Sequence, residues 1–507
     1  MNGADFVPPA RHPTLRSSRS FGMIFSSFIF IFVFLPLAVG GYYLFGRKSV
    51  KSANRWLLAA SFFFYGWWNI GFLPLMLILI VCNYAIGLAL HRFRYKKALL
   101  VLGIGTNLAV LGYYKYTDFF IQTINRILHT GWSLHNIILP LGISFYTFQA
   151  LSYIIDVYMQ KTQPEKSFSA FALYISLFPQ LIAGPIVDHK MMIPQFASKE
   201  RHRFNAQNFS SGITLFAFGV FKKVVIADRL SPVVADVFGH ISTLTFTDAW
   251  IGVLSYALQL YFDFSAYSEM AIGLGNMLNL TFPSNFDSPY QACSMIDFWR
   301  RWHISLGSWI RNYIYIPLGG NRNGERRKMI NLLIAMTLCG LWHGAGFKYI
   351  AWGMLHGTFL VVNHRWRRFA KRHDMHMPKI AGWAMTFGAT CIGWALFRAP
   401  SLRSGISLVK TMLNLHKLSL PAGGKVENLL AFLQYFGVPF AKYPDYPYGL
   451  LMALLVVVFC VPSAERLVAA HFRASWKWLC ASSAALAYSL YLLAVNQNLS
   501  EFLYFQF

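Results

Sequence analysis

Long apolar runs recur along almost the whole sequence, and this feature limits the possible folds more than any other. The first run begins near residue 23, the last ends near residue 494, and short clusters of Lys and Arg separate many of them. A helix needs about 20 predominantly apolar residues to cross the hydrocarbon core of a bilayer. Charged residues make up only 13% of the chain, against about 25% in soluble domains. The sequence therefore predicts a polytopic membrane protein.

The apolar runs favour helices over β-strands, because the strands of a membrane barrel alternate apolar and polar residues over about 10 positions. A chain of 507 residues has room for about 11–13 transmembrane helices and their loops. The runs 136–157 and 168–187 contain Pro and Gly, and the stretch 297–320 mixes Trp and Tyr with Arg. Irregular backbone at membrane depth must face protein or water. We therefore predict an all-α membrane fold with re-entrant or interfacial helices around a central tunnel.

The basic residues give the chain a large net charge without indicating nucleic acid. There are 45 Lys and Arg against 19 Asp and Glu, a net charge of +26. These residues cluster between apolar runs, and no nucleic-acid-binding motif accompanies them. Such clusters mark cytoplasmic loops and contact anionic lipid headgroups. We expect membrane lipids and no nucleic acid as partners, and a last run, about 478–494, that leads outward from the cytoplasm.

Composition divides the chain into a short extension and one large domain. Residues 1–22 are polar and form an N-terminal extension, and residues 23–507 form a single membrane domain that ends in an aromatic tail, 496–507. The six cysteines lie mostly in or beside apolar runs and form no CxxC pair. They indicate small apolar residues rather than a disulfide framework or a zinc site. We therefore predict no metal site.

Two histidines are the candidate catalytic residues. His343 lies in the motif LWHGAG, where one apolar run ends and the next begins. Ionisable residues inside membrane spans are rare and usually face a cavity or a partner, and the flanking glycines allow close approach. His303 follows the tripeptide RRW, which also suits a helix end at the membrane interface. A structural role is the alternative for both, and we interpret His356, in the motif LHG, as structural.

Two long motifs, in order and well spaced, carry a resemblance to a known family. They are DFWRRWHISLGSWIRNYIYIPLGGNR (297–322) and WHGAGFKYIAWGMLHG (342–357), and shorter matches are FPQLIAGPI (178–186), YFDFSAY (261–267) and FLYFQF (502–507). These motifs resemble the membrane-bound O-acyltransferase (MBOAT) family, in the branch of the alginate O-acetylases and the teichoic-acid D-alanyl transfer proteins. The likeness runs from about residue 23 to the C-terminus and implies the MBOAT fold and an O-acyltransferase activity.

The resemblance and the chemistry of acyl transfer assign roles to both histidines. Acyl transfer to a hydroxyl needs a base for the proton and stabilisation of the oxyanion. His343 matches the central histidine of the family, and we predict that it is the general base. His303 matches the second histidine of this branch, and we predict that it orients substrate or donates to the oxyanion. The chain has no GxSxG motif, which favours direct attack on a thioester, or a short relay, over a seryl intermediate.

The donor is predicted to be acetyl-coenzyme A or a carrier-bound acyl thioester on the cytoplasmic side, used as a co-substrate with no bound cofactor. Arg322, Arg326 and Arg327 are candidates to bind its phosphates, although a basic loop of this kind also marks the cytoplasmic side. Trp342 is a further candidate for contact with substrate or donor. Asp263 lies in an apolar aromatic segment, where it is expected to pair with an arginine or to line the tunnel.

The leading functional hypothesis is a bacterial inner-membrane O-acyltransferase that passes acetyl groups across the membrane for O-acetylation of an exported or cell-wall polysaccharide. The resemblance implies an extracytoplasmic, esterase-like partner that completes the transfer. One alternative is a lipid or protein O-acyltransferase of the same superfamily. Another is a transporter of an acyl carrier or a glycan, because broken helices and buried polar residues also suit transporters.

Tyr504, in the aromatic tail, is a candidate acyl relay. The predicted topology places the tail outside, where its aromatic residues suit an interfacial anchor. Alternatively the tail folds back into the outer mouth of the tunnel, and Tyr504 accepts the acyl group as an ester. A neutral phenol with a pKa near 10 is a poor nucleophile, so a base such as His343 is required.

Overall fold

The computed structural model describes residues 23–417, 448–495 and 502–503 of the chain. The predicted N-terminal extension, 1–22, and most of the aromatic tail, including Tyr504, lie outside the described residues. Within the described ranges the structure is helical, and its sole β-type pairing is an isolated bridge between Phe286 and Trp302. The predicted all-α fold is therefore confirmed.

The helices follow one another with short connections. The first half of the chain forms α1 (Leu35–Gly46), α2 (Val50–Trp68), α3 (Leu73–Arg92), α4 (Lys96–Leu128), α5 (Ile143–Tyr158), α6 (Phe168–Ser176), α7 (Phe178–Leu181), α8 (His189–Ala197), α9 (Ala206–Phe221) and α10 (Asp228–Gly239). The second half forms α11 (Phe246–Met277), α12 (Met295–Arg301), α13 (Ile304–Ile310), α14 (Gly324–His343), α15 (Phe347–Arg372), α16 (Lys379–Arg398), α17 (Leu402–Leu413), α19 (Tyr448–Cys460), α20 (Ala464–His471) and α21 (Trp476–Val495).

Several helices meet the requirements for crossing a bilayer. In the described part of the chain, five helical stretches are long and apolar enough, and the bent pair α19–α20 makes a sixth if it crosses once. The chain is thus a multi-pass membrane protein. Other apolar runs form helices that carry polar residues. For example, α11 buries Gln259, Asp263 and Glu269. Such residues lower the mean hydropathy of the helices that contain them. The predicted 11–13 spans therefore exceed the five or six helices of the described residues that qualify by length and composition.

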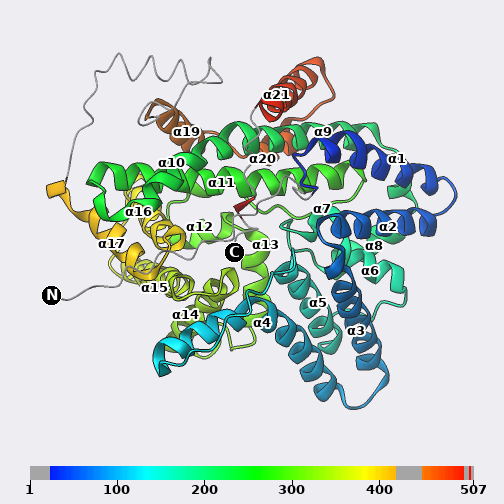
Figure 1. The fold of residues 1–507 in the computed structure, drawn as a ribbon, viewed down its shortest axis with the longest axis horizontal. Helices are drawn as coiled ribbons and strands as arrows, with labels where there is room; N and C mark the ends of the chain where they lie inside the picture. Colours follow the sequence, from blue (N-terminus) through cyan, green and yellow to red (C-terminus); the bar gives the residue numbers. More distant parts are fainter. Residues whose placement is uncertain (1–22, 418–447, 496–501, 504–507) are drawn as a thin grey trace.

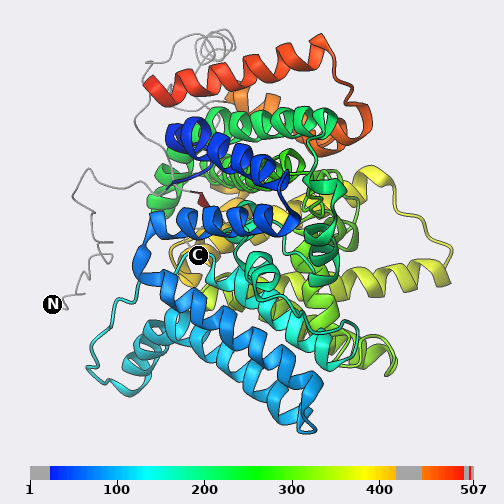
Figure 2. The same ribbon diagram turned by 90° about the vertical axis from the view of Figure 1, so that its right-hand side faces the viewer.

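The buried helix α11 lies at the centre of the arrangement. Figure 1 shows α10 and α9 following one another across the molecule, with α11 beside both of them and α21 along the outer side of α9. The pair α3–α4 lies at the opposite edge from α21 in both views (Figures 1 and 2). Nearly every side chain of α11 is buried, so this helix is surrounded by protein and forms the core on which the other helices pack.

The two Pro- and Gly-containing runs are interrupted as predicted. Helix α5 begins only at Ile143, after Gly142 with φ of +71°, and helix α6 ends before Leu177, where α7 starts a new turn. A Cβ atom on Gly142 would meet the carbonyl oxygen of Leu181. Glycine is required there both for its positive φ and for this close approach. The two broken segments therefore contact each other inside the protein, where their free backbone groups are shielded from lipid.

Helices α14 and α15 form a tight antiparallel hairpin, and His343 lies where it turns. Near the other end of the hairpin, Arg368 Nη1 lies 3.9 Å from Glu325 Oε2. The helices pack backbone against backbone, because Cβ atoms on Gly340 and Gly353 would meet the carbonyl oxygens of Tyr349 and Met336. Small residues allow membrane helices to approach this closely. The position of His343 therefore depends on Gly340 and Gly353, neither of which has a reactive side chain.

Gly353→Ala is expected to separate the hairpin and to destabilise the protein by about 1–3 kcal/mol, the usual cost of overpacking. The measurement is the midpoint of thermal unfolding of the detergent-purified protein. Gly388→Ala in α16 is the matched control, because nothing lies within 4 Å of the Cβ position there. Equal midpoints for the two variants would contradict the tight packing.

Candidate active site

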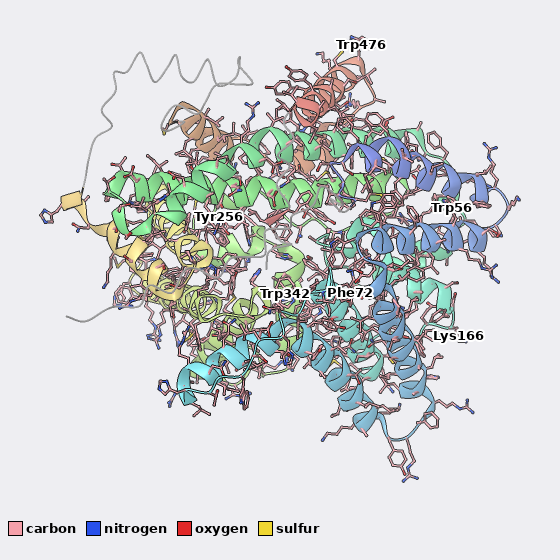
Figure 3. The ribbon with its side chains drawn as sticks, viewed as in Figure 1. Trp56, Phe72, Lys166, Tyr256, Trp342 and Trp476 are labelled. Atoms are coloured by element: carbon pink, nitrogen blue, oxygen red, sulfur yellow. The ribbon has the colours of Figure 1, made fainter. Side chains whose placement is uncertain are left out.

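His343 is the last residue of α14, and its side chain is buried among aromatic rings. Its imidazole lies 5.2 Å from the ring of Trp352 and 5.4 Å from that of Phe397, both edge to face. The neighbouring indole of Trp342 is also buried, at 5% exposure, whereas Trp476 is 75% exposed. Figure 3 shows Trp342 well inside the molecule and Trp476 at its outer edge. The candidate base therefore lies in the protein interior.

Helix α4 supplies the cap for the end of α14 that carries His343. The last carbonyl groups of a helix have no partner within the helix. The hydroxyl of Tyr116 donates to the carbonyl of Leu341 at 2.8 Å. The ammonium of Lys115 donates to the carbonyls of Trp342 at 2.6 Å and of His343 at 3.3 Å. Two side chains of α4 thus bind three consecutive carbonyls and hold the backbone of His343 in place.

A cavity of about 50 Å³ lies beside His343. Its walls come from α4, from the broken segment before α5 with the first turn of α5, and from the end of α14. The lining residues are Lys115, Leu139, Pro140, Leu141, Gly142, Ile143, Ser144, Phe145, Ile182, Trp342 and His343. One water needs roughly 10–15 Å³ of such space, so the cavity has room for a small polar group beside His343. The continuous tunnel stays a prediction.

His303 lies on a strained turn on the other side of Trp342. It precedes α13 with φ of +45°, a left-handed conformation that non-glycine residues rarely adopt. Its ring lies 6.1 Å from the ring of Trp342. Nδ1 lies 3.2 Å from Oδ1 of Asn285, an acceptor, so the proton of neutral His303 is on Nδ1. Trp342 therefore contacts both histidines, although His303 does not line the cavity.

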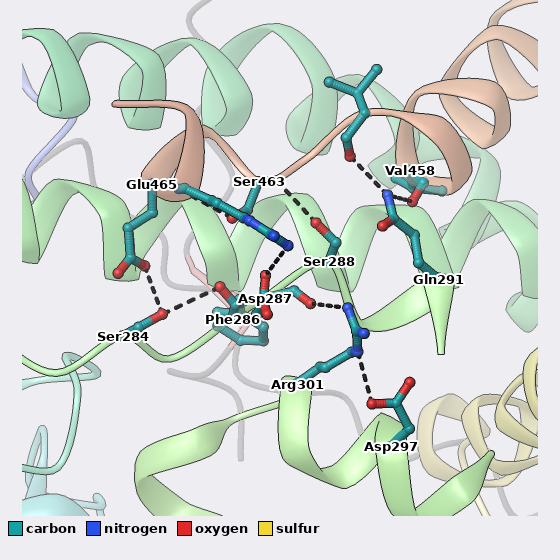
Figure 4. A network of polar contacts seen from close by, with 12 residues as sticks. Ser284, Phe286, Asp287, Ser288, Gln291, Asp297, Arg301, Val458, Ser463 and Glu465 are labelled. Atoms are coloured by element: carbon teal, nitrogen blue, oxygen red, sulfur yellow. Dashed lines mark hydrogen bonds and ion pairs between the residues drawn. The ribbon is translucent and has the colours of Figure 1, made fainter. Parts of the chain in front are cut away.

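The turn of His303 is held by the segment 284–291, which is tied in turn to the end of the chain. The side-chain oxygen of Asn285 accepts from His303. The backbone carbonyl of Asn285 accepts from the amide of Ile304 at 3.0 Å. Figure 4 shows the polar contacts of this segment with the pair α19–α20. Ser284 donates to Glu465 at 3.1 Å, and the amide of Ser463 donates to Ser288 at 2.9 Å. The bent pair α19–α20 thus supports the position of His303.

Asp263 pairs with a lysine rather than with the predicted arginine. Its Oδ1 lies 2.7 Å from Nζ of Lys223, which also contacts Asp228 at 2.8 Å. A lysine on the neighbouring helical turn (Lys222–Ala227) can reach α11 because that turn packs directly on it. The other oxygen, Oδ2, accepts from the backbone amide of Leu503 at 2.9 Å. Asp263 therefore joins the C-terminal tail to the core.

The two described tail residues are buried beside this ion pair. Phe502 and Leu503 are 2% and 7% exposed. The ring of Phe502 lies edge to face with Tyr267 at 4.8 Å, and the ammonium of Lys223 lies over it at 4.6 Å. The adjacent residue of α11, Phe264, contacts the ring of His303 at 4.8 Å. This part of the tail is thus packed inside the protein, beside residues that contact His303, rather than at an exposed interface.

The three candidate donor-binding arginines lie far from the cavity. Arg322, Arg326 and Arg327 are exposed at the start of α14, and a helix of 20 residues is about 30 Å long. They therefore occupy the opposite end of the helix from His343. His356 is fully buried, against Trp352 at 4.6 Å and Trp299 at 5.5 Å, and its structural role stays a prediction.

The sequence arguments missed Lys115, Ser144, Asn285 and Lys223 as parts of the site. Lys115 could have been found, because it is a lone lysine in the segment GYYKYTDFF at membrane depth, where ionisable residues usually have a function. Ser144 and Asn285 carry no such signal, since short polar residues are common at helix ends and turns. No group of three or more His, Cys, Asp or Glu side chains in the described ranges is placed to hold a metal.

Comparison with known proteins agrees with the motifs of the sequence. The membrane-bound O-acyltransferase family model matches residues 165–404. A peptidoglycan O-acetyltransferase of Helicobacter pylori is 37% identical, and the match covers 96% of this chain and 98% of that protein. A probable alginate O-acetylase of Pseudomonas aeruginosa is 43% identical over 77% of this chain and 75% of that protein. A teichoic acid D-alanyltransferase of Streptococcus thermophilus is 30% identical over 46% of this chain and 58% of that protein.

Asp263→Ala is expected to release the tail. The substitution removes the oxygen that accepts from the Leu503 amide and one of the two carboxylates that pair with Lys223. The measurement is the rate at which carboxypeptidase removes C-terminal residues from the detergent-purified protein, which we expect to rise at least several-fold. Asp236→Ala is the control, since Asp236 is 65% exposed and pairs only with its helical neighbour His240 in the described structure. Equal digestion rates in both variants would show that Asp263 does not anchor the tail.

Proposed function

The chain belongs to the membrane-bound O-acyltransferase family, and we propose that it is an inner-membrane enzyme that passes acetyl groups from a cytoplasmic thioester to a polysaccharide or peptidoglycan acceptor. The observation that carries this proposal is the buried His343, held by α4 beside a small cavity. The names of the relatives support the acceptor class, since they include a peptidoglycan O-acetyltransferase and probable alginate O-acetylases. Acetyl-coenzyme A or an acylated carrier is the proposed donor.

His343 is proposed to act as the general base. A neutral imidazole takes the proton of the attacking hydroxyl while the new carbon–oxygen bond forms and the carbonyl electrons move to oxygen. When the tetrahedral intermediate collapses, the carbon–sulfur bond breaks and His343 returns the proton to the thiolate. His303 is proposed to orient the substrate through its contact with Trp342. This division suits the geometry, because His343 lines the cavity and His303 does not.

The donor and the acceptor are proposed to approach from opposite sides of the membrane. The start of α14 is basic, with Arg322, Arg326 and Arg327, and is assigned to the cytoplasmic side by the positive-inside rule. It is also the proposed binding site for the phosphates of the donor. An extracytoplasmic, esterase-like partner protein is proposed to complete transfer to the glycan. Acyl groups would then travel along α14, from its basic end to the cavity at His343.

His343→Ala is expected to lower acetyl transfer by about 10²–10⁴-fold, the usual contribution of a general base. The measurement is release of free thiol from acetyl-coenzyme A, together with acetyl content of the cell-surface glycan, at equal amounts of membrane protein. His303→Ala should lower the rate less. His240→Ala, whose side chain is 70% exposed, is the control. Wild-type glycan acetylation in the His343 variant would remove this residue from the mechanism.

Tyr504 is proposed to carry the acyl group as an aryl ester between the thioester and the final acceptor. The burial of Phe502 and Leu503 beside Asp263 supports this proposal, because the next residue in the chain is Tyr504. The phenol proton would pass to a base as the ester bond forms, and the thiol would leave with a proton. Phenolate leaves more readily than an alkoxide, so the ester remains a good donor for the second transfer.

Tyr504→Phe keeps the ring and removes only the hydroxyl, so it tests the relay directly. We expect loss of glycan acetylation with normal insertion, and an acetyl group on the C-terminal peptide of the wild type by mass spectrometry. Tyr491→Phe, at a half-exposed tyrosine of α21, is the control. Full acetylation by Tyr504→Phe would refute the relay and leave the tail as an anchor.

A further inference from the structure

Lys115 places its side-chain amine beside the cavity, half-buried and without a carboxylate partner in the described ranges. Its ammonium contacts two backbone carbonyls and the hydroxyl of Ser144. In the described ranges no carboxylate lies within ion-pair distance of it. A buried charge is costly unless it is paired, and charged residues at membrane depth usually have a function. A negative charge that appears during the reaction would complement it.

Ser144 offers a hydrogen-bond donor in the same cavity. Its side-chain oxygen lies 3.4 Å from Nζ of Lys115. An ammonium can only donate, so this oxygen is the acceptor and the hydroxyl keeps its own proton. No acceptor for that proton lies among the described residues. Ser144 is 8% exposed and stands in the first turn of α5, where the helix also contributes partial positive charge.

Ser144 and His343 belong to different walls of one small cavity. Ser144 comes from α5, His343 comes from α14, and Lys115 of α4 contacts both. The volume of about 50 Å³ exceeds that of a single water and suits a short acyl group. A carbonyl carbon between the two walls would have a base on one side and a donor with a positive charge on the other.

We propose that the Ser144 hydroxyl and the Lys115 ammonium together stabilise the oxyanion of acyl transfer. This inference rests on the proposed acyltransferase function and adds catalytic groups to it. As the attacking oxygen bonds to the carbonyl carbon and its proton passes to His343, the carbonyl electron pair moves to oxygen. That oxygen accepts the Ser144 proton as a hydrogen bond, and Lys115 neutralises its charge. The pair returns to the carbonyl when the carbon–sulfur bond breaks.

The same arrangement separates the roles of the two histidines. Preorganised donors aimed at a developing negative charge stabilise it, and Ser144 lines the same cavity as His343. His303 lies outside the residues that line the cavity. Oxyanion stabilisation is therefore assigned to Ser144 and Lys115, and substrate orientation to His303.

Ser144→Ala is the first test, with thiol release from acetyl-coenzyme A by the detergent-purified full chain as the assay. Loss of one oxyanion donor typically lowers kcat about 10²–10³-fold, and we expect that loss with an unchanged KM for the donor and an unchanged melting temperature. Ser152→Ala is the matched control, because Ser152 is a buried serine on the same helix that donates to its own helix backbone. Equal kcat for the two variants would overturn the proposal.

Conservative variants distinguish the loss of a catalytic group from a loss of folding. Ser144→Thr keeps a hydroxyl and should recover most of the activity that Ser144→Ala loses. Lys115→Arg keeps the charge and should be more active than Lys115→Met, and both are assayed well below their melting temperatures because Lys115 also caps α14. If the threonine variant is as inactive as the alanine variant, or the arginine variant as inactive as the methionine variant, the proposal fails. A wild-type protein that consumes no thioester would overturn the proposed function itself, whereas equal activity of wild type and Ser144→Ala would overturn only this inference.

Discussion

The absence of water in a bilayer requires every backbone polar group at membrane depth to find a partner inside the protein. A helix that ends inside the protein exposes carbonyl groups that need partners, and α14 ends at the buried His343. The structure satisfies this constraint with Tyr116 and Lys115 of α4, which bind the carbonyls of residues 341–343. The helix can therefore stop beside a cavity instead of continuing to the opposite surface, and the imidazole is held at its tip.

The site is built from elements that are far apart in sequence and linked by a few polar contacts. The hairpin α14–α15 carries His343, and the turn before α13 carries His303, which Asn285 orients. Segment 284–291 connects that turn to α19–α20, and Asp263 connects α11 to Leu503. Because each contact lies in a low dielectric, the loss of one partner leaves a charge or a dipole unsatisfied. The middle and the end of the chain thus depend on each other.

The sequence predicted the helical membrane fold and the broken segments, because each depends on a strong local signal, and the role of His343 stays a prediction. Apolar length predicts helices, Pro and Gly predict the breaks, and an imidazole between apolar runs indicates a function. Local sequence patterns could not predict that Asp263 pairs with Lys223 instead of an arginine. This pairing depends on how the turn after α9 packs on α11. The role proposed for Ser144 could not be predicted for the same reason, since only the contact with Lys115 distinguishes it from other serines at helix ends.

The contact between Asp263 and Leu503 also bears on how the protein is made. Leu503 is buried in the core, and it follows all the described helices in the sequence, so the ribosome releases it only after those helices have been synthesised. The Lys223–Asp263 pair must then receive the tail after the bundle has assembled, with the Asp263 carboxylate able to accept one more hydrogen bond. Packing of Phe502 and Leu503 into the core is thus a step that follows the synthesis of the helices on which they pack.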